Sequence, residues 1–117
     1  MVFDFSAARM KHLNWRMRLQ LFIEDPTSVR DGEFVSEHDC QLGKWLDGRG
    51  GAKWGHLPTM KQLVQVHAAV HRLARSIVQE AKAGASVEAR RLFASLSPQT
   101  DEVVGLLNKL ESEVAPK

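Results

Sequence analysis

Apolar residues recur at intervals of three and four positions along most of this chain, and that spacing constrains its fold more than any other feature. Residues 58–83 keep the spacing longest and place one broad apolar face along the segment: Leu63, Val66, Val70, Leu73, Ala74, Ile77 and Ala81. This period is that of an amphipathic α-helix, whereas no segment shows the sustained alternation typical of a β-strand. The sequence therefore predicts an all-α protein.

Proline and glycine residues divide this periodic pattern into separate helices. Helices are predicted over residues 3–24, 36–47, 58–83 and 87–96, and over a last segment that restarts at Ser97 and Pro98. Pro26 ends the first helix because proline disfavours helical geometry in the residue before it, and Gly84 ends the third. Ser36 is predicted to cap the short second helix, and the glycines of residues 48–51 to stop it. Four long helical units favour an antiparallel four-helix bundle, with an additional short helix that carries Cys40.

Length and charge narrow the class of protein further. The 117 residues are expected to form one domain, residues 1–117. The net charge is +2, and basic and acidic residues are mixed along the chain, which argues against a nucleic acid or an anionic membrane as partner. No stretch approaches the ~20 apolar residues that span a bilayer, and the first residues lack the features of a signal peptide. With a single cysteine, a cytoplasmic protein, or a soluble piece of a larger one, is expected.

The first predicted helix has apolar residues on two opposite faces. One face carries Phe5, Ala8, His12, Trp15, Leu19 and Phe22. The other carries Met10, Leu13, Met17 and Leu21. A helix with two apolar faces must bury both of them. One face fits the core of the domain and the second predicts a homodimer, the alternative being a central helix buried within one subunit.

His67 and His71 form an H-x-x-x-H pair inside the predicted helix 58–83. Residues four positions apart lie on the same helix face, so both imidazoles can reach one metal ion at about 2.0–2.1 Å. Such a pair taken alone is more often two ordinary residues at the flank of a helix. Here both histidines lie beside the apolar face, where they would be desolvated, and a shared metal would satisfy them.

Cys40, the only cysteine of the chain, and His12 complete a candidate set of ligands. Taken singly, a lone cysteine is usually a small buried hydrophobic residue, and a lone core histidine is usually satisfied by a backbone carbonyl. Together with the histidine pair they supply one thiolate and three imidazoles, which can close a tetrahedral shell around Zn²⁺. His38 is expected to be exposed or to support a ligand, and His56 to be solvated. The predicted zinc ligands are His12, Cys40, His67 and His71.

The residues around the candidate ligands are expected to pack the site into the bundle. Leu42, Trp45 and Leu46 would anchor the short helix, and Gly43 would let a neighbouring helix approach closely. Trp15 lies one turn from His12 and would help to exclude water, although core packing is its more direct role.

These residues, in this order, resemble the chemoreceptor zinc-binding domain family. The motif pieces are His12 with Trp15, then Cys40 with Leu42, Gly43 and Trp45, then His67 with His71, at approximately the family's gaps. The resemblance covers residues 12–71 directly, and residues 84–117 match only as amphipathic helix. It implies a cytoplasmic bacterial helical bundle, often dimeric, that regulates chemotaxis receptors or diguanylate cyclases, and it assigns zinc ligation to the same four residues. It also implies that the cysteine senses hypochlorous acid and related oxidants.

The 117 residues contain no receptor or cyclase module, so an excised domain or a free-standing family member is expected. Three classes of function are compatible with a zinc site. A mono-zinc hydrolase usually keeps an open water position and a nearby carboxylate, whereas four ligands fill this shell and Ala68, Ala69 and Val70 separate the histidines. We therefore predict a non-enzymatic sensory or regulatory domain that responds to zinc, to oxidants or to both. The alternative is a structural zinc-stapled dimerisation module without a sensing role.

Overall fold

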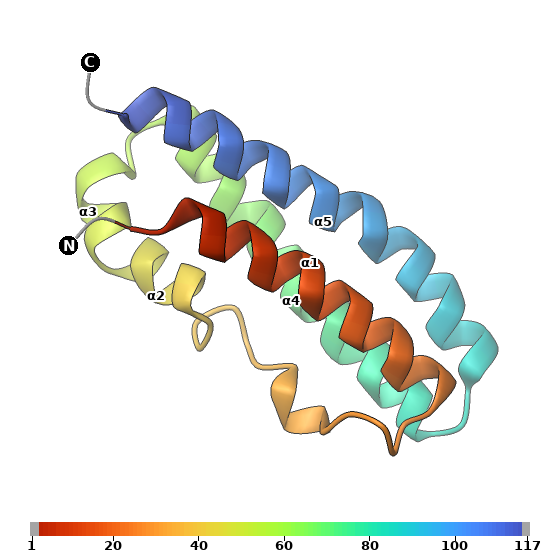
Figure 1. Ribbon diagram of the computed structural model, residues 1–117. Helices are drawn as coiled ribbons and strands as arrows, with labels where there is room; N and C mark the ends of the chain where they lie inside the picture. Colours follow the sequence, from red (N-terminus) through yellow and green to blue (C-terminus); the bar gives the residue numbers. More distant parts are fainter. Residues whose placement is uncertain (1–2, 116–117) are drawn as a thin grey trace.

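The computed structural model of the protein describes residues 3–115 and contains only helices and their connections within that range (Figure 1). The elements are α1 (Phe5–Glu24), the 3-10 helix η1 (Asp31–Glu33), α2 (Gln41–Asp47), α3 (Arg49–Trp54), α4 (Pro58–Lys82) and α5 (Ser86–Val114). The predicted all-α class is therefore confirmed. None of the helices in this range has an apolar stretch that could cross a lipid bilayer.

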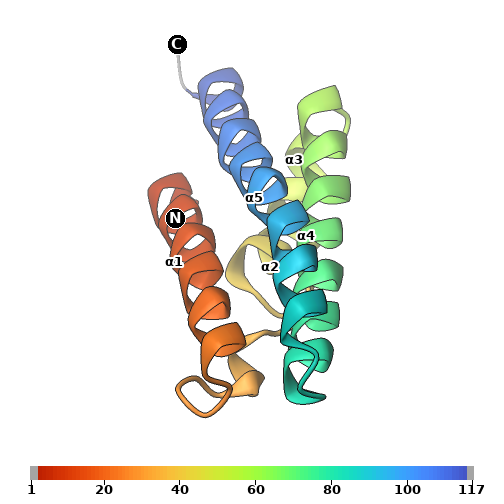
Figure 2. The same ribbon diagram turned by 90° about the vertical axis from the view of Figure 1, so that its right-hand side faces the viewer.

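Three long helices form the body of the molecule. α4 and α5 form an antiparallel hairpin that turns at Gly84, whose φ of +81° suits glycine, and α1 packs on α5 (Figures 1 and 2). The segment 25–57, with η1, α2 and α3, runs back along the side where α1 and α4 face each other. The molecule is elongated, 50 × 23 × 19 Å, because the 29 residues of α5 span about 43 Å at the helical rise.

The all-helical bundle agrees with the prediction, but several helix boundaries differ. The short helix begins at Gln41, after its N-cap Cys40, and not at residue 36. α5 is continuous through Pro98, where a restart was expected. A proline inside a helix costs about 3 kcal/mol. On either side of it Leu96 and Val103 are completely buried, and such burial stabilises a helix by about 1.5–3 kcal/mol for each side chain. Packing therefore outweighs the local cost, and residues 86–114 form one helix instead of two.

The glycines of residues 48–51 do not end the helical region as expected. Only Gly48 interrupts it, and α3 follows at once. A Cβ atom on Gly50 would lie 2.5 Å from the ring of Trp45, and one on Gly51 would lie 2.2 Å from the carbonyl oxygen of Leu46. These two glycines therefore serve the close packing of α3 on α2, which the sequence pattern did not distinguish from a stop.

The two apolar faces of α1 have different surroundings. On the predicted core face Phe5, Ala8, Leu19 and Phe22 are buried together with His12, and Trp15 is half-buried. On the opposite face Met10, Met17 and Leu21 are 66%, 61% and 48% exposed, and Leu13 is half-buried. The alternative in which α1 is buried on both faces within one subunit is therefore wrong.

Candidate metal centre

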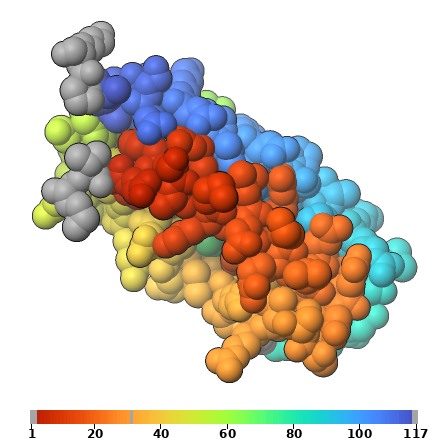
Figure 3. All heavy atoms as spheres, viewed as in Figure 1, coloured from red at the N-terminus to blue at the C-terminus, as the bar shows by residue number. Residues whose placement is uncertain are grey.

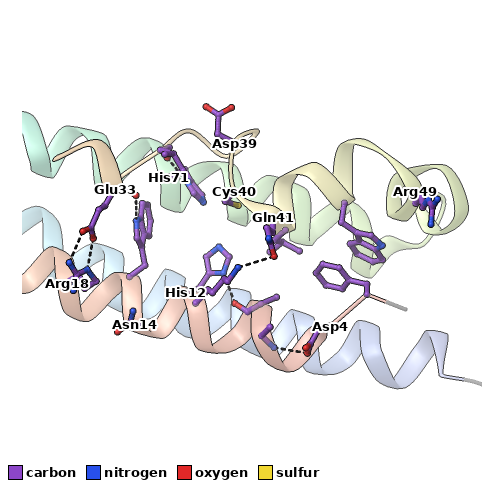
Figure 4. Close-up of a pocket in the computed structure, with 18 residues that line it drawn as sticks. Asp4, His12, Asn14, Arg18, Glu33, Asp39, Cys40, Gln41, Arg49 and His71 are labelled. Atoms are coloured by element: carbon purple, nitrogen blue, oxygen red, sulfur yellow. Dashed lines mark hydrogen bonds and ion pairs between the residues drawn. The ribbon is translucent and has the colours of Figure 1, made fainter. Parts of the chain in front are cut away.

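His12, Cys40, His67 and His71 come together where segment 25–57 covers the gap between α1 and α4. One potential ligand atom from each of the four lies within 4.8 Å of all the others. α1 supplies His12, the residue before α2 supplies Cys40, and α4 supplies the two remaining histidines. The structure thus brings together every residue of the predicted ligand set. Figure 4 shows the side chains of His12, Cys40 and His71 pointing toward one another from these three elements.

The distances within the cluster suit a tetrahedral ion. Around zinc, with Zn–N of about 2.0–2.1 Å and Zn–S of about 2.3 Å, neighbouring ligand atoms are about 3.3–3.6 Å apart. The Sγ atom of Cys40 lies 3.2 Å from Nε2 of His67. The remaining donor atoms all lie within 4.8 Å of one another.

Backbone carbonyls orient two of the imidazoles. Nδ1 of His12 lies 2.8 Å from the carbonyl oxygen of Ala8, and Nδ1 of His71 lies 2.8 Å from that of Val35. A carbonyl only accepts, so in both rings Nδ1 carries the proton and Nε2 keeps its lone pair. Nε2 of His71 is buried and has no hydrogen-bond partner among residues 3–115. A buried acceptor without a donor costs stability, and a bound cation would satisfy it.

Cys40 is the N-cap of α2, a position that the sequence prediction gave to Ser36. Its Sγ atom accepts a hydrogen bond from the backbone N–H of Gly43, at 3.3 Å. Ser36 instead donates its hydroxyl hydrogen to the carboxylate of Asp39, at 3.0 Å, in the turn that precedes the helix. A thiolate at the first turn of a helix is stabilised both by the N–H group and by the helix dipole.

Gly43 permits a close contact with the loop before α2. A Cβ atom at this position would lie 1.5 Å from the carbonyl oxygen of Glu37, closer than any side chain can come. The neighbour is therefore the backbone of the preceding loop and not another helix, as the sequence had suggested. This contact fixes the turn that holds Cys40 against α4.

Electrostatics keep the four donors in the forms that suit a cation. Burial, together with the neighbouring imidazoles, lowers the pKa of His67 to about 2, and burial lowers the pKa of His71 to about 4. Burial also lowers the pKa of His12. All three rings are therefore neutral at pH 7. Burial raises the pKa of the Cys40 thiol, partly offset by the N–H of Gly43, so a metal would displace its proton.

Aromatic residues hold the surrounding elements in place. The Trp15 ring lies 4.6 Å from the His71 ring, and its Nε1 donates to the carbonyl oxygen of Glu33 at 3.1 Å. Trp45 stacks on Phe3 at 4.2 Å and meets Phe5 edge-on at 5.7 Å. These contacts fasten α2 to the beginning of α1, in agreement with the predicted anchoring role of this part of the short helix.

The remaining histidines lie outside the cluster. His38 is exposed, with Nδ1 2.7 Å from a carboxylate oxygen of Asp47, and His56 is exposed as well. Sequence reasoning missed Glu37, whose Oε2 is buried without a hydrogen-bond partner among the described residues. It named a backbone carbonyl as the usual partner of a lone core histidine, but it did not identify Ala8 and Val35 as the residues that supply one. No sequence pattern marks a carbonyl as a histidine partner, because the contact depends only on how the backbone folds.

The chemistry of the four donors and the comparison of the chain with known proteins both indicate the same metal. Three neutral imidazoles and one thiol, with no carboxylate in the cluster of described residues, match the nitrogen and sulfur ligands that zinc takes in closed sites. The sequence model of the chemoreceptor zinc-binding domain family matches residues 12–78 of the chain. Searches among curated proteins and among solved structures returned no significant match. The matched region covers more than half of the chain and includes all four clustered residues, while α5 lies outside it. The chain therefore belongs to the chemoreceptor zinc-binding domain family, whose cofactor is zinc.

Proposed function

We propose that this protein is a zinc-dependent sensory and regulatory domain of bacterial signalling, in which His12, Cys40, His67 and His71 hold one Zn²⁺ ion. The observation that carries the proposal is the convergence of these four donors, from three separate elements, within 4.8 Å. The family to which the chain belongs supports zinc as the ion. In this proposal the 117 residues act as one cytoplasmic domain.

The ligands tie together elements that otherwise share few contacts. Zinc supplies the positive charge that holds Cys40 as a thiolate and joins α1, α2 and α4. The carbonyl groups of Ala8 and Val35 keep the rings of His12 and His71 aimed at the ion. If one ligand is lost, α1 and the loop before α2 are free to move relative to α4. Such a change in helix packing is a common means by which a local event becomes a signal.

Two inputs fit this arrangement. The concentration of free zinc sets the occupancy of the site directly. Hypochlorous acid or a related oxidant acts instead on the sulfur of Cys40, which is partly exposed. The thiolate is then oxidised by two electrons to a sulfenic acid while hypochlorous acid is reduced to chloride. A sulfenic acid is a poorer zinc ligand, so the two inputs have the same structural consequence.

The exposed stripe of α1 supports a homodimer. Met10, Met17 and Leu21 form an apolar row on the face that points away from the core, beside the half-buried Leu13. A second copy that pairs α1 with α1 would cover both rows. The helix that supplies His12 would then also form the interface, so a change at the metal centre would reach the partner subunit. The proposed downstream partner is a chemotaxis receptor or a diguanylate cyclase.

The alternative function is a zinc-stapled dimerisation module that senses nothing. The closure of the site favours it, because His67 and His71 are each only 2% exposed. The two functions differ in whether zinc exchanges under physiological conditions. An enzyme is a weaker candidate, since four donors would fill the shell of a zinc ion and leave no open position for a water molecule.

The first test is elemental analysis of protein that was purified without a metal-affinity tag. We expect about one zinc ion per chain in the wild type and a clear reduction in Cys40→Ala, because a missing ligand opens the shell. The matched control is His38→Ala, which removes an exposed imidazole two residues away and should leave the zinc content unchanged. Wild-type protein that takes up no zinc, and whose stability a chelator does not change, would exclude the proposal and its alternative together.

A further inference from the structure

A pocket lies directly beside the candidate metal centre. It has a volume of about 750 Å³ and opens between α1 and residues 33–49. Three of the four predicted ligands line it, namely His12, Cys40 and His71. In the space-filling view a hollow separates the red and orange atoms of α1 from the yellow atoms of α2 (Figure 3). α4 and α5 pack against each other, and Leu63, Val70 and Leu107 on these helices are completely buried.

Besides the ring contacts of Trp15 and Trp45, exposed polar side chains connect α1 to the other wall of the pocket. Nζ of Lys11 donates to the side-chain oxygen of Gln41 at 3.0 Å, and both residues are exposed. Arg18 pairs with Glu33 through both carboxylate oxygens. Exposed polar contacts of this kind contribute about 1 kcal/mol or less each, so they open easily compared with the packed core.

Lys11 places a positive charge in the pocket, close to two of the predicted ligands. Lys11 lies beside His12 and has a neutral partner, whereas Arg18 and Glu33 compensate each other. Asp39 also lines the pocket, and its carboxylate accepts a hydrogen bond from the hydroxyl of Ser36. Although burial is the main cause of both pKa shifts, the charge of Lys11 also lowers the pKa of His12 and of Cys40, as expected of an ammonium group close to both.

We propose that this pocket is the exchange route of the metal centre, and that it admits small anionic molecules with carboxylate or thiolate donors that deliver or remove zinc. The inference rests on the proposed function and adds a mechanism of exchange to it. The fold need not open, because an incoming donor atom can reach the side of His12, Cys40 and His71 that faces the pocket. Lys11 attracts such an anion and repels a cationic competitor.

This route determines how the rate of zinc transfer depends on the chelator. If exchange passes through the pocket, the rate rises in proportion to the concentration of an anionic chelator. If zinc leaves only when the fold opens, the rate is independent of that concentration. The measurement uses the zinc-loaded 117-residue protein mixed with excess EDTA, and the zinc that remains bound is determined after timed desalting.

Two pairs of variants test the walls and the charge of the pocket. Ala7→Trp fills the pocket and should slow both removal and reloading about tenfold at unchanged zinc affinity, while Ala94→Trp, on the exposed surface of α5, should not. Lys11→Gln should slow removal by EDTA several-fold and accelerate removal by the cationic chelator triethylenetetramine, whereas Lys61→Gln should change neither.

The outcomes separate this inference from the proposed function. A rate that does not depend on chelator concentration, or equal rates for Ala7→Trp and Ala94→Trp, would overturn the exchange route while zinc binding stands. If Ala7→Trp fails to fold, Asn14→Trp replaces it, because Asn14 is exposed and also lines the pocket. Protein that holds no zinc at all would instead remove the proposed function on which the inference rests.

Discussion

The α4–α5 hairpin and segment 25–57 are stabilised in different ways. The hairpin has a continuous apolar interface, in which Leu63, Val70, Ile77 and Val103 are completely buried. Segment 25–57 contains only the 3-10 helix η1 and two helices of six and seven residues. It adjoins the centre in which Nε2 of His71 and Oε2 of Glu37 are buried without partners among the described residues. Apolar packing therefore stabilises the hairpin, whereas a bound cation would satisfy the buried polar groups beside the segment.

The largest effect is expected in the hairpin. Leu107→Ala should lower the free energy of unfolding by about 2–5 kcal/mol, because it leaves a cavity at a completely buried position. The loss should be the same with and without zinc, since distant and independent sites add. Urea unfolding of both forms measures it. A loss that depends on zinc would show that the two regions are not independent.

Removal of zinc should destabilise segment 25–57 and leave the α4–α5 hairpin nearly unchanged. At a zinc concentration of 1,000 times the dissociation constant, the ion stabilises the folded state by about 4 kcal/mol. Without it, we expect faster amide hydrogen exchange in segment 25–57 and in the first turns of α1, and little change in α4 and α5. Hydrogen exchange followed by mass spectrometry checks this. Uniform acceleration along the chain would contradict the comparison.

Gly43→Ala should displace Cys40 and thereby weaken the contribution of segment 25–57 to the metal centre. The added methyl group cannot lie 1.5 Å from the carbonyl oxygen of Glu37, so α2 and Cys40 must shift. We expect zinc affinity to fall about 10- to 100-fold, as for other residues that orient ligands. Gly105→Ala is the matched control, because a Cβ atom there meets nothing within 4 Å. Competition with a chelator of known affinity gives the constants.

Zinc affinity should depend on pH through Cys40. Its thiol pKa is raised by burial, so zinc must displace one proton, and affinity should rise about tenfold for each pH unit between pH 6.5 and the pKa of the thiol. His67 and His71 do not compete for protons there, because their pKa values are about 2 and about 4. Zinc titrations at several pH values measure the slope. In Cys40→Ala the slope should disappear.

His67 and His71 should also make the stability of the metal-free protein depend on pH. Their folded pKa values lie below the ordinary 6.5, so the unfolded chain binds more protons. Stability is therefore complete above pH 6.5 and declines as the pH falls below it. Denaturant unfolding of metal-free protein at pH 7 and at pH 5 measures the decline.

The smallest effect is expected for His38→Ala. His38 is exposed, and its ion pair with Asp47 lies on the surface, where such pairs contribute about 0–1 kcal/mol. Zinc affinity should not change, because this imidazole is not among the four clustered donors. The same chelator competition tests it. A lower zinc affinity in this variant would mean that His38 contributes to the metal centre.

The sequence predicted the parts of this structure that depend on periodic patterns. The apolar spacing located α1 and α4, and Gly84 marked the turn before α5. It failed at Pro98 and at Gly50, where tertiary packing decides against the local preference. A proline is tolerated because its neighbours are buried, and a glycine is needed because the Trp45 ring lies above it. Neither condition can be read from residues close by in the sequence.

The predicted ligand set came from residue types and spacing, and the structure brings its four members together. The supporting groups could not be predicted in this way. The carbonyl groups of Ala8 and Val35 act through the backbone, which every residue possesses. The pocket beside Cys40 arises from the path of the loop before α2, and loops carry no periodic pattern.

One sulfur atom serves two purposes in this fold. Sγ of Cys40 caps the first turn of α2 through the N–H of Gly43, and it also faces His67 in the cluster. A new bond at that atom would therefore disturb the cap of α2 and one donor of the candidate metal centre in a single step. In the function proposed above, a chemical change at one atom would in this way alter the shape of the surface around α2.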